Sequence, residues 1–346
     1  MEGAAGFEKL IIPLDFCAEN QTLETQAQSE LRNIVDSFQP AIEAAIGYGS
    51  GILPQDGYGS DTGDRSDTKQ LDFIFLVKDS AQFHRENLQQ NPGHYSAKSL
   101  MWINLIQGKG IFFNPYVSIQ NHVTKYGVVD ERSALMDLSE WSSLYFAGRM
   151  QKPVNYIKEH DVMVKFLNQY NLKNAMTIAI FLIQSNQFSE RELYEQITSL
   201  SYLGDFRMYV GGENPNKVRN IVSKQFHHFR KLYQPILDYF IHRNYLILTN
   251  NDDKDRTFKT NLNASAKIKL ISCLPLKFRT QLYSRYPESS IKEIATDRNL
   301  AYNIKQLITR TIIYSSVVQA IKGVFASGML KSMRYALAKR RKNGLG

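Results

Sequence analysis

A short glycine-containing turn and an aspartate on the next apolar segment are the residues of this chain best suited to chemistry. Gly49, Ser50 and Gly51 end one apolar segment, and Asp72 lies near the start of the next, which ends at Val77. Glycines let backbone N–H groups approach a phosphate closely, and the serine hydroxyl adds a short donor. A carboxylate on the neighbouring strand can hold a Mg²⁺ ion that bridges phosphates. The pattern predicts a nucleotidyltransferase site that binds a nucleoside triphosphate.

The elements that must position these residues alternate between helix and strand. Apolar side chains recur at helical spacing in residues 24–38, before the glycine turn. Asp79 follows the second apolar segment and can cap a helix, and residues 111–119 and 122–129 have the pattern of a hairpin. We therefore expect an α+β fold in which helices flank a mixed sheet.

Beyond Pro153 the sequence becomes mainly helical. Helices are expected over residues 162–184 and 189–200, and Ser189 with Glu192 forms a capping box at the start of the second. A polar run at Asn250 separates two short strand candidates, which is typical of the wing of a winged-helix unit. The expected regions are a nucleotidyltransferase domain at 1–155, a winged-helix-like domain at 156–262 and a C-terminal helical region at 263–346.

Charge is distributed unevenly along the chain. The 346 residues carry a net charge of +9, yet ten Lys or Arg and no acidic residue follow Asp297, which leaves 32 basic and 33 acidic side chains before it. The two cysteines exclude a disulfide framework and a cysteine-based zinc site. We expect residues 308–325 either to pack on the core or to begin a surface helix, and the distal part to lie on an anionic membrane. The basic residues of that distal part are Lys331, Arg334, Lys339, Arg340, Arg341 and Lys342.

Six motifs occur in order along the chain and carry a family resemblance. They are Tyr48-Gly-Ser-Gly51, Leu71-Asp72-Phe73, Asn91-Pro-Gly-His-Tyr-Ser96, Lys125-Tyr-Gly-Val128, Ala147-Gly-Arg-Met-Gln-Lys-Pro153 and Leu203-Gly-Asp-Phe-Arg-Met208. With these motifs the sequence resembles the mitochondrial-type CDP-diacylglycerol synthases, also called the mitochondrial translocator assembly and maintenance family. The resemblance implies that CTP and phosphatidic acid are converted with Mg²⁺ to CDP-diacylglycerol and pyrophosphate. It also implies a nucleotidyltransferase domain, a winged-helix-like domain and a membrane-associating C-terminus.

The resemblance also suggests a second metal ligand. The commonest nucleotidyltransferase pattern has another aspartate two positions after Asp72, but Ile74 stands there. Asp205 lies in the last motif and is our candidate, with Asp67 as the alternative. Asp205 could instead be a turn residue paired with Arg207.

Cations and one histidine inside the motifs are candidates for ligand contacts. Lys125 is predicted to contact the nucleotide, and Arg149, Lys152 and Arg207 are predicted to contact phosphate or lipid. His94 could face the nucleotide or be a satisfied structural histidine.

Location follows from the same resemblance. The first forty residues resemble neither a secretory signal nor an arginine-rich transit peptide. We expect a peripheral membrane protein, on the matrix face of the mitochondrial inner membrane if eukaryotic, or on the cytoplasmic face of the cell membrane if bacterial.

Two other functions remain open at this point. A winged-helix unit with a basic tail also suits a nucleotidyltransferase that acts on RNA. Because residues 1–297 are nearly neutral, we expect no nucleic-acid partner. The second alternative is a non-catalytic assembly factor for membrane translocases, favoured by Ile74. Oligomeric state does not follow from the sequence.

Overall fold

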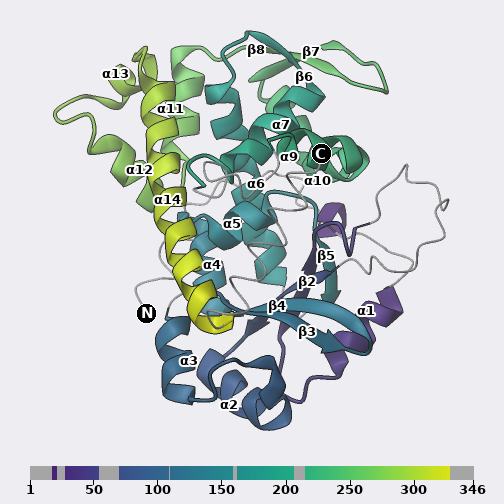
Figure 1. The fold of residues 1–346 in the computed structure, drawn as a ribbon. Coiled ribbons are helices and arrows are strands. Elements are labelled where there is room, and N and C mark those ends of the chain that lie inside the picture. Colours follow the sequence, from purple (N-terminus) through teal and green to yellow (C-terminus); the bar gives the residue numbers. More distant parts are fainter. Residues whose placement is uncertain are drawn as a thin grey trace.

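The first half of the chain folds around a five-stranded mixed sheet (Figure 1). The computed structural model describes residues 18–21, 28–53, 70–108, 110–158, 162–205 and 215–327. The strands are β1 (Ala44–Tyr48), β2 (Leu71–Val77), β3 (Phe112–Ile119), β4 (His122–Asp130) and β5 (Asn155–Lys158), in the spatial order β3-β4-β2-β1-β5. Only β2 and β4 pair in parallel; the other neighbours are antiparallel.

The register of the central strands brings three functional candidates together. Asp72 of β2 pairs with Tyr48 of β1 on one side and with Lys125 of β4 on the other. Side chains of directly paired residues point to the same face of a sheet. The sheet therefore places a tyrosine, an aspartate and a lysine in one row.

The two faces of the sheet have different cores because side chains alternate along each strand. Phe73 and Phe75 pack against α1 (Gln28–Asp36) and α2 (Ser80–Gln90). Ile74 and Leu76 face the other way. They join a cluster that includes α4 (Glu131–Glu140), α5 (Tyr145–Met150) and α6 (Val162–Leu182). Asp72 lies on the same face as Ile74, so it points toward α5.

Local sequence signals account for several boundaries of this part. Asp79 accepts hydrogen bonds from the N–H groups of Ala81 and Gln82 and caps α2, as predicted. Gln120 and Asn121 adopt positive φ angles of 48° and 66° in the two-residue turn of the predicted hairpin, which suits the twist of antiparallel strands. The short helix α3 (Leu100–Gln107) and the 3-10 turns η2 (Ala18–Gln21) and η3 (Pro92–His94) complete this part.

The next part is helical with a small antiparallel sheet. Its helices are α6, α7 (Glu190–Leu200), α9 (Lys217–Lys224) and α10 (Phe226–His242), and its sheet has the order β6 (Gln187–Ser189), β8 (Thr257–Thr260), β7 (Leu246–Asn250). Ser189 and Glu192 form the predicted capping box. The hairpin β7–β8 forms on either side of the polar run near Asn250, where a wing was predicted.

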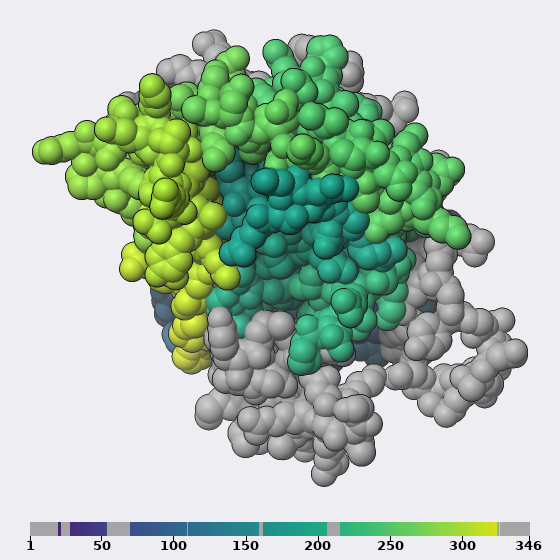
Figure 2. All heavy atoms as spheres, turned by 90° about the horizontal axis from the view of Figure 1, so that it is seen from above, coloured from purple at the N-terminus to yellow at the C-terminus, as the bar shows by residue number. Residues whose placement is uncertain are grey.

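Within the described residues 263–327, four helices follow, and the last of them runs along one side of the molecule. They are α11 (Ala264–Ser272), α12 (Leu276–Tyr283), α13 (Ile291–Thr296) and α14 (Leu300–Ser327). Figure 1 shows α14 starting near α13, passing α12 and ending beside α3, and in Figure 2 it forms an edge of the molecule. Ile304, Ile308 and Ile312 are buried, whereas Ile321 and Phe325 are exposed. The expected packing on the core therefore holds for the first part of α14, and the surface helix stays a prediction for the exposed last part.

Some predictions for this part are not tested by the structure. One apolar cluster runs from Ala44 in the sheet to Ile312 in α14, so the domain limits at 155 and 262 remain a prediction. The six distal basic residues, from Lys331 to Lys342, lie outside the described residues. Within the described ranges, no helix combines the length and the apolar character that crossing a bilayer requires.

Candidate active site

A cavity of about 250 Å³ lies where the sheet, α5, the turn at residues 201–205 and α14 meet. Its charged lining comprises two carboxylates and four cations: Asp72, Asp205, Lys125, Arg149, Lys152 and Lys217. Aromatic rings supply further walls: Tyr48, Phe113, Tyr145 and Tyr202. Residues predicted from four separate motifs therefore meet around one space.

Asp72 lies beside the glycine turn, as its position after that turn suggested. A Cβ atom at Gly49 would lie 3.4 Å from Asp72 Oδ2, and Gly49 has a φ of +78° that favours glycine. Gln70 Nε2 donates to Asp72 Oδ1 at 3.1 Å, and Lys125 Nζ lies 3.9 Å from the same oxygen. The Asp72 carboxylate is thus oriented by Gln70, just before its own strand, and by Lys125 of β4.

The rest of the glycine turn has a packing role in this structure. A Cβ atom at Gly51 would lie 2.2 Å from the backbone oxygen of Gln70, so only glycine lets the turn pass the start of β2. Ser50 is exposed. Tyr48 lines the cavity, whereas Gly49, Ser50 and Gly51 do not. Phosphate binding by the turn stays a prediction.

Asp205 reaches the cavity from a turn that is packed under α14. Gly204 has a φ of +79°, and a Cβ atom there would lie 2.8 Å from the backbone oxygen of Thr309. Asp205 is 1% exposed, and its N–H donates to the oxygen of Tyr202 at 3.2 Å. The structure therefore brings Asp205 to the same cavity as Asp72. Ile74 also lines it, so an apolar side chain stands where the commonest pattern has its second aspartate.

Lys152 is the most deeply buried cation of the cavity. It is 3% exposed, and its Nζ donates to the backbone oxygen of Gly148 and, at 2.7 Å, to Ser201 Oγ. Burial lowers the pKa of Lys152 well below its usual value, and the charges of Arg149 and Lys217 lower it further. An anion in the cavity would reverse this effect. The lysine also ties α5 to the turn that carries Asp205.

The other cations lie over aromatic rings. Arg149 Cζ is 4.2 Å from the ring centre of Tyr48, and Lys125 Nζ is 4.6 Å from that of Phe113. Cation–π contact of this kind holds a charged side chain without neutralising it. Both side chains can keep these contacts while their charge acts on a bound anion.

Sequence reasoning missed several polar residues of the cavity, among them Lys217, Ser315 and Ser316. Lys217 is the first residue of α9, and its Nζ lies 5.4 Å from the ring centre of Tyr202. Ser315 and Ser316 reach the cavity from α14. A lysine at a helix N-terminus opposes the helix dipole, and this unfavourable position could have marked Lys217 as a candidate. The sequence alone, however, did not give the residue at which the helix starts.

His94 is not brought to the cavity. Its Nδ1 lies 2.9 Å from the hydroxyl oxygen of Tyr126, and its ring packs on Phe38. Tyr126 follows Lys125 on β4, so the two side chains point to opposite faces of the sheet. Burial lowers the pKa of His94 to about 4. Its position agrees with the structural alternative and offers no support for nucleotide contact.

Comparison with known proteins now identifies the family. A family model described as phosphatidate cytidylyltransferase, mitochondrial, matches residues 31–342. The chain belongs to this family. A Schizosaccharomyces pombe relative of that name is 36% identical over 348 residues, which cover 94% of this chain and 86% of the relative. The Saccharomyces cerevisiae relative is 35% identical, covering 93% and 72%, and the Mus musculus relative is 31% identical, covering 90% and 94%. The resemblance found from the motifs is confirmed.

The carboxylates of this phosphatidate cytidylyltransferase family member suit a magnesium ion shared with substrate. Among the described residues, no group of three or more His, Cys, Asp or Glu side chains could hold a metal. Mg²⁺ in nucleotide sites is commonly held by one or two carboxylates together with substrate phosphates. Asp72 and Asp205 in one cavity fit that arrangement. Asp67 and Arg207 lie outside the described residues.

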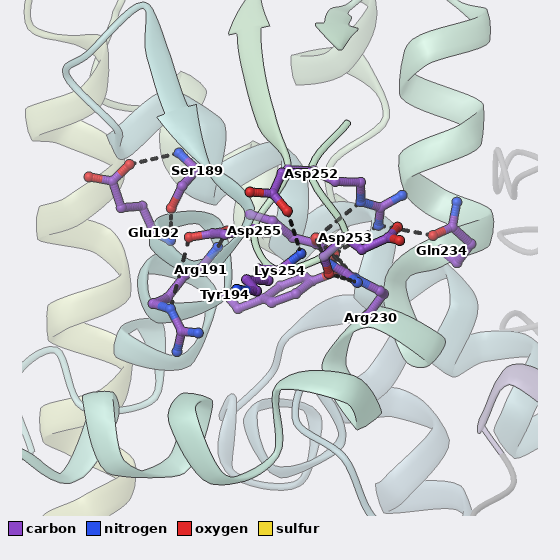
Figure 3. A network of polar contacts seen from close by, with 12 residues as sticks. Ser189, Arg191, Glu192, Tyr194, Arg230, Gln234, Asp252, Asp253, Lys254 and Asp255 are labelled. Atoms are coloured by element: carbon purple, nitrogen blue, oxygen red, sulfur yellow. Dashed lines mark hydrogen bonds and ion pairs between the residues drawn. The ribbon is translucent and has the colours of Figure 1, made fainter. Parts of the chain in front are cut away.

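A second buried charged cluster lies in the helical part (Figure 3). The Glu190 side chain is fully buried, and it accepts hydrogen bonds from Arg230, Arg256 and Tyr194 at 2.6 to 3.1 Å. Arg256 directly precedes β8 and Arg230 lies on α10. The cluster therefore fastens the β7–β8 hairpin to α7 and α10.

Proposed function

We propose that this protein forms CDP-diacylglycerol and pyrophosphate from CTP and phosphatidate in the cavity that contains Asp72 and Asp205. Family membership supports the reaction, and the observation that carries the location is the meeting of both carboxylates with four cations around one cavity. The excess of cations suits substrates that bring a triphosphate and a phosphate monoester together.

The reaction requires one bond exchange at phosphorus. A phosphate oxygen of phosphatidate attacks the α-phosphorus of CTP and forms a new phosphorus–oxygen bond, while the bond from the α-phosphorus to the β-bridging oxygen breaks. The electron pair of that bond leaves with pyrophosphate. Because the nucleophile is already anionic, the site must position two anions and offset their repulsion more than it must remove a proton.

Three of the cations can position the two anions and offset their repulsion in different ways. Lys125 reaches the cavity from β4 beside Asp72, and Arg149 reaches it from α5 over the ring of Tyr48. Lys152 is fixed by Gly148 and Ser201, so its charge has a constant position. A phosphate next to it favours the charged form of the amine. Of the aromatic walls, Tyr145 is proposed to pack against the cytosine base, because Arg149 lies over the ring of Tyr48 and Lys217 over that of Tyr202.

Asp72 and Asp205 would hold Mg²⁺. The bound ion would neutralise phosphate charge and favour departure of pyrophosphate. Gln70 and Lys125 keep the Asp72 carboxylate oriented toward the cavity.

The basic C-terminus is proposed to recruit the protein to its lipid substrate. Basic residues near an anionic bilayer contribute about 1 kcal/mol each. The relatives are named as mitochondrial proteins, which supports a mitochondrial location. The peripheral position on the matrix face of the inner membrane is part of the proposal.

The test is an assay with CTP, Mg²⁺ and phosphatidate in vesicles, with an RNA primer as the competing acceptor. We expect CDP-diacylglycerol and pyrophosphate in equal amounts and no extension of the RNA. Extension of the primer would overturn the lipid acceptor and support the RNA alternative. No product from either acceptor, with a folded protein, would support the non-catalytic alternative.

A further inference from the structure

Helices α3 and α14 expose large apolar side chains next to each other. Met101 and Leu105 of α3 are 80% and 70% exposed, and Ile321 and Phe325 of α14 are 52% and 51% exposed. Trp102 joins the two helices, because its ring meets that of Phe325 edge-on with centroids 5.8 Å apart. We refer to these five residues as the apolar face. In Figure 1 this end of α14 lies beside α3.

The two helices are fixed to each other by a polar contact. Lys322 Nζ donates to the backbone oxygen of Gln107 at 2.7 Å, at the last residue of α3. A cation at a helix C-terminus satisfies a free carbonyl and complements the helix dipole. The apolar face is therefore shared by two elements that are held together, and it is not a set of independent side chains.

The same helix connects the apolar face to the cavity. Tyr314, Val317, Ile321 and Phe325 fall within roughly 80° of the helix circumference at 100° per residue, and all four are exposed. Ser315 and Ser316, on another side of α14, line the cavity. A lipid that reaches the apolar face is thus beside the helix that borders the reaction site.

The charges around the apolar face select one type of partner. No Asp or Glu occurs in residues 87–129, which contain α3, or in residues 298–346, which contain α14. Both stretches carry lysine, including Lys98 two residues before α3 and Lys322 in α14. An anionic surface can therefore approach both elements without meeting a carboxylate of either.

We propose that the apolar face inserts between the lipids of an anionic membrane, with α3 as a second membrane-contacting element beside α14. The proposal rests on the proposed function, because a two-chain lipid substrate has to be taken from a bilayer. Exposed apolar side chains next to lysines suit the interface, where side chains reach the acyl boundary and cations meet headgroups. A second copy of the chain suits it less, since a symmetric contact would oppose two cationic surfaces.

The first experiment measures vesicle binding without substrate. The variant M101S/L105S is compared with wild type on vesicles of phosphatidylcholine with phosphatidylglycerol and on vesicles of phosphatidylcholine alone. We expect the variant to lose at least about tenfold in affinity for the anionic vesicles, since two exposed apolar side chains no longer enter the lipid. Both side chains are exposed, so folding should be retained, which circular dichroism and the unfolding midpoint check.

A matched control removes two aliphatic side chains elsewhere. Ile247 and Leu248 of β7 are 42% and 36% exposed, and β7 lies far from α3 in Figure 1. I247S/L248S should bind vesicles like wild type. Equal loss in both double variants would overturn a role specific to the apolar face, and wild-type binding by M101S/L105S would overturn the proposal outright.

Tryptophan fluorescence gives an independent readout. The chain has two tryptophans, and Trp141 is 3% exposed while Trp102 is 38% exposed. On wild-type binding to anionic vesicles we expect a blue shift and quenching by bromine atoms on the acyl chains. Unchanged emission would place Trp102 outside the membrane and overturn the proposal. A dimer that M101S/L105S abolishes would do the same, in favour of a second copy.

Failure of the proposed function gives a different result. Vesicle binding is measured without CTP or phosphatidate, so it does not depend on catalysis. If wild type binds through the apolar face but makes no CDP-diacylglycerol, docking stands and the function fails. If both hold, M101S/L105S should lose activity on vesicles while keeping it on a short-chain, water-soluble phosphatidate.

Discussion

The charges around Glu190 and the charges of the cavity are organised in opposite ways. Around Glu190, one carboxylate meets Arg230, Arg256 and the hydroxyl of Tyr194 at hydrogen-bond distance. In the cavity, the contact between Asp72 and Lys125 is 3.9 Å long, and four cations face two carboxylates. The first group is closed on itself, whereas the second surrounds an open space.

The difference separates a structural ion cluster from a candidate binding site. Burial alone would raise the pKa of Glu190, but hydrogen bonds from Arg256, Arg230 and Tyr194 outweigh it and hold the pKa at about 2. The Glu190 carboxylate is therefore charged, and its ion pairs with the two arginines hold the β7–β8 hairpin in place. In the cavity, Lys152 has a pKa well below its usual value because burial and neighbouring cations oppose its charge. Such a lysine gains most from an added anion, which is what a substrate phosphate supplies.

The largest expected effect is on activity. Asp72→Asn and Asp205→Asn should each lower turnover of CTP and phosphatidate by at least about a hundredfold, by analogy with the loss of one electrostatic stabiliser of a transition state. The thermal unfolding midpoint should stay close to that of wild type. Near-normal CDP-diacylglycerol formation by Asp205→Asn would remove Asp205 from the metal site and favour Asp67.

The matching change in the other cluster should act on stability. Glu190→Gln leaves the partly buried Arg230 and Arg256 without their countercharge. It should lower the free energy of unfolding by about 3 kcal/mol at pH 7. Turnover per folded molecule should remain. Urea unfolding and the CTP assay measure the two effects. A large loss of turnover with unchanged stability would contradict the division between the clusters.

The pH dependence of stability, compared between wild type and Glu190→Gln, sharpens this prediction. Because the folded pKa of Glu190 lies below the ordinary value of 4.5, its contribution is complete above pH 4.5 and is lost as pH falls toward about 2. The difference in unfolding midpoint between wild type and Glu190→Gln should therefore narrow over that interval.

Lys217 should have a smaller effect, on substrate affinity. Lys217→Ala removes one cation from the cavity and should raise the KM for CTP or phosphatidate about tenfold, which is the size of one charge-assisted hydrogen bond. Lys292→Ala, an exposed lysine on α13, is the control and should change neither KM. Equal values for both variants would exclude Lys217 from substrate binding.

The smallest effect is expected at His94. His94→Gln should leave the KM for CTP within about twofold of wild type and lower the free energy of unfolding by about 1 kcal/mol, because it disturbs one partly buried hydrogen bond to Tyr126. A tenfold rise in this KM without loss of stability would instead support the nucleotide contact predicted from the sequence.

Sequence reasoning succeeded where the signal is local. The cap at Asp79, the capping box of Ser189 and Glu192 and the turn at Gln120 depend on residues a few positions apart, and each formed as predicted. The closeness of Asp72 to the glycine turn also followed, because a single β1–β2 pairing joins them.

Sequence reasoning was weaker where distant segments meet. Asp205 was found only through a family motif, and its meeting with Asp72 depends on α14 packing against Gly204. Lys217, Ser315 and Ser316 belong to no motif that marks them. His94 lies inside a motif, yet the alternation of side chains on β4 keeps it away from the cavity, on the face to which Tyr126 points.

The sequence by itself determined the family, the alternation of helices and strands, the first carboxylate of the site and the concentration of positive charge after Asp297. The tertiary structure decided which cations share the cavity, that Asp205 joins Asp72, and that α14 buries one end and exposes the other. The physical reason is that turns, caps and strand periodicity are set by neighbours along the chain. The faces that α14 and the turn at 201–205 present are set by packing against residues far away along the chain, such as Gln107 for α14 and Gly148 for the turn.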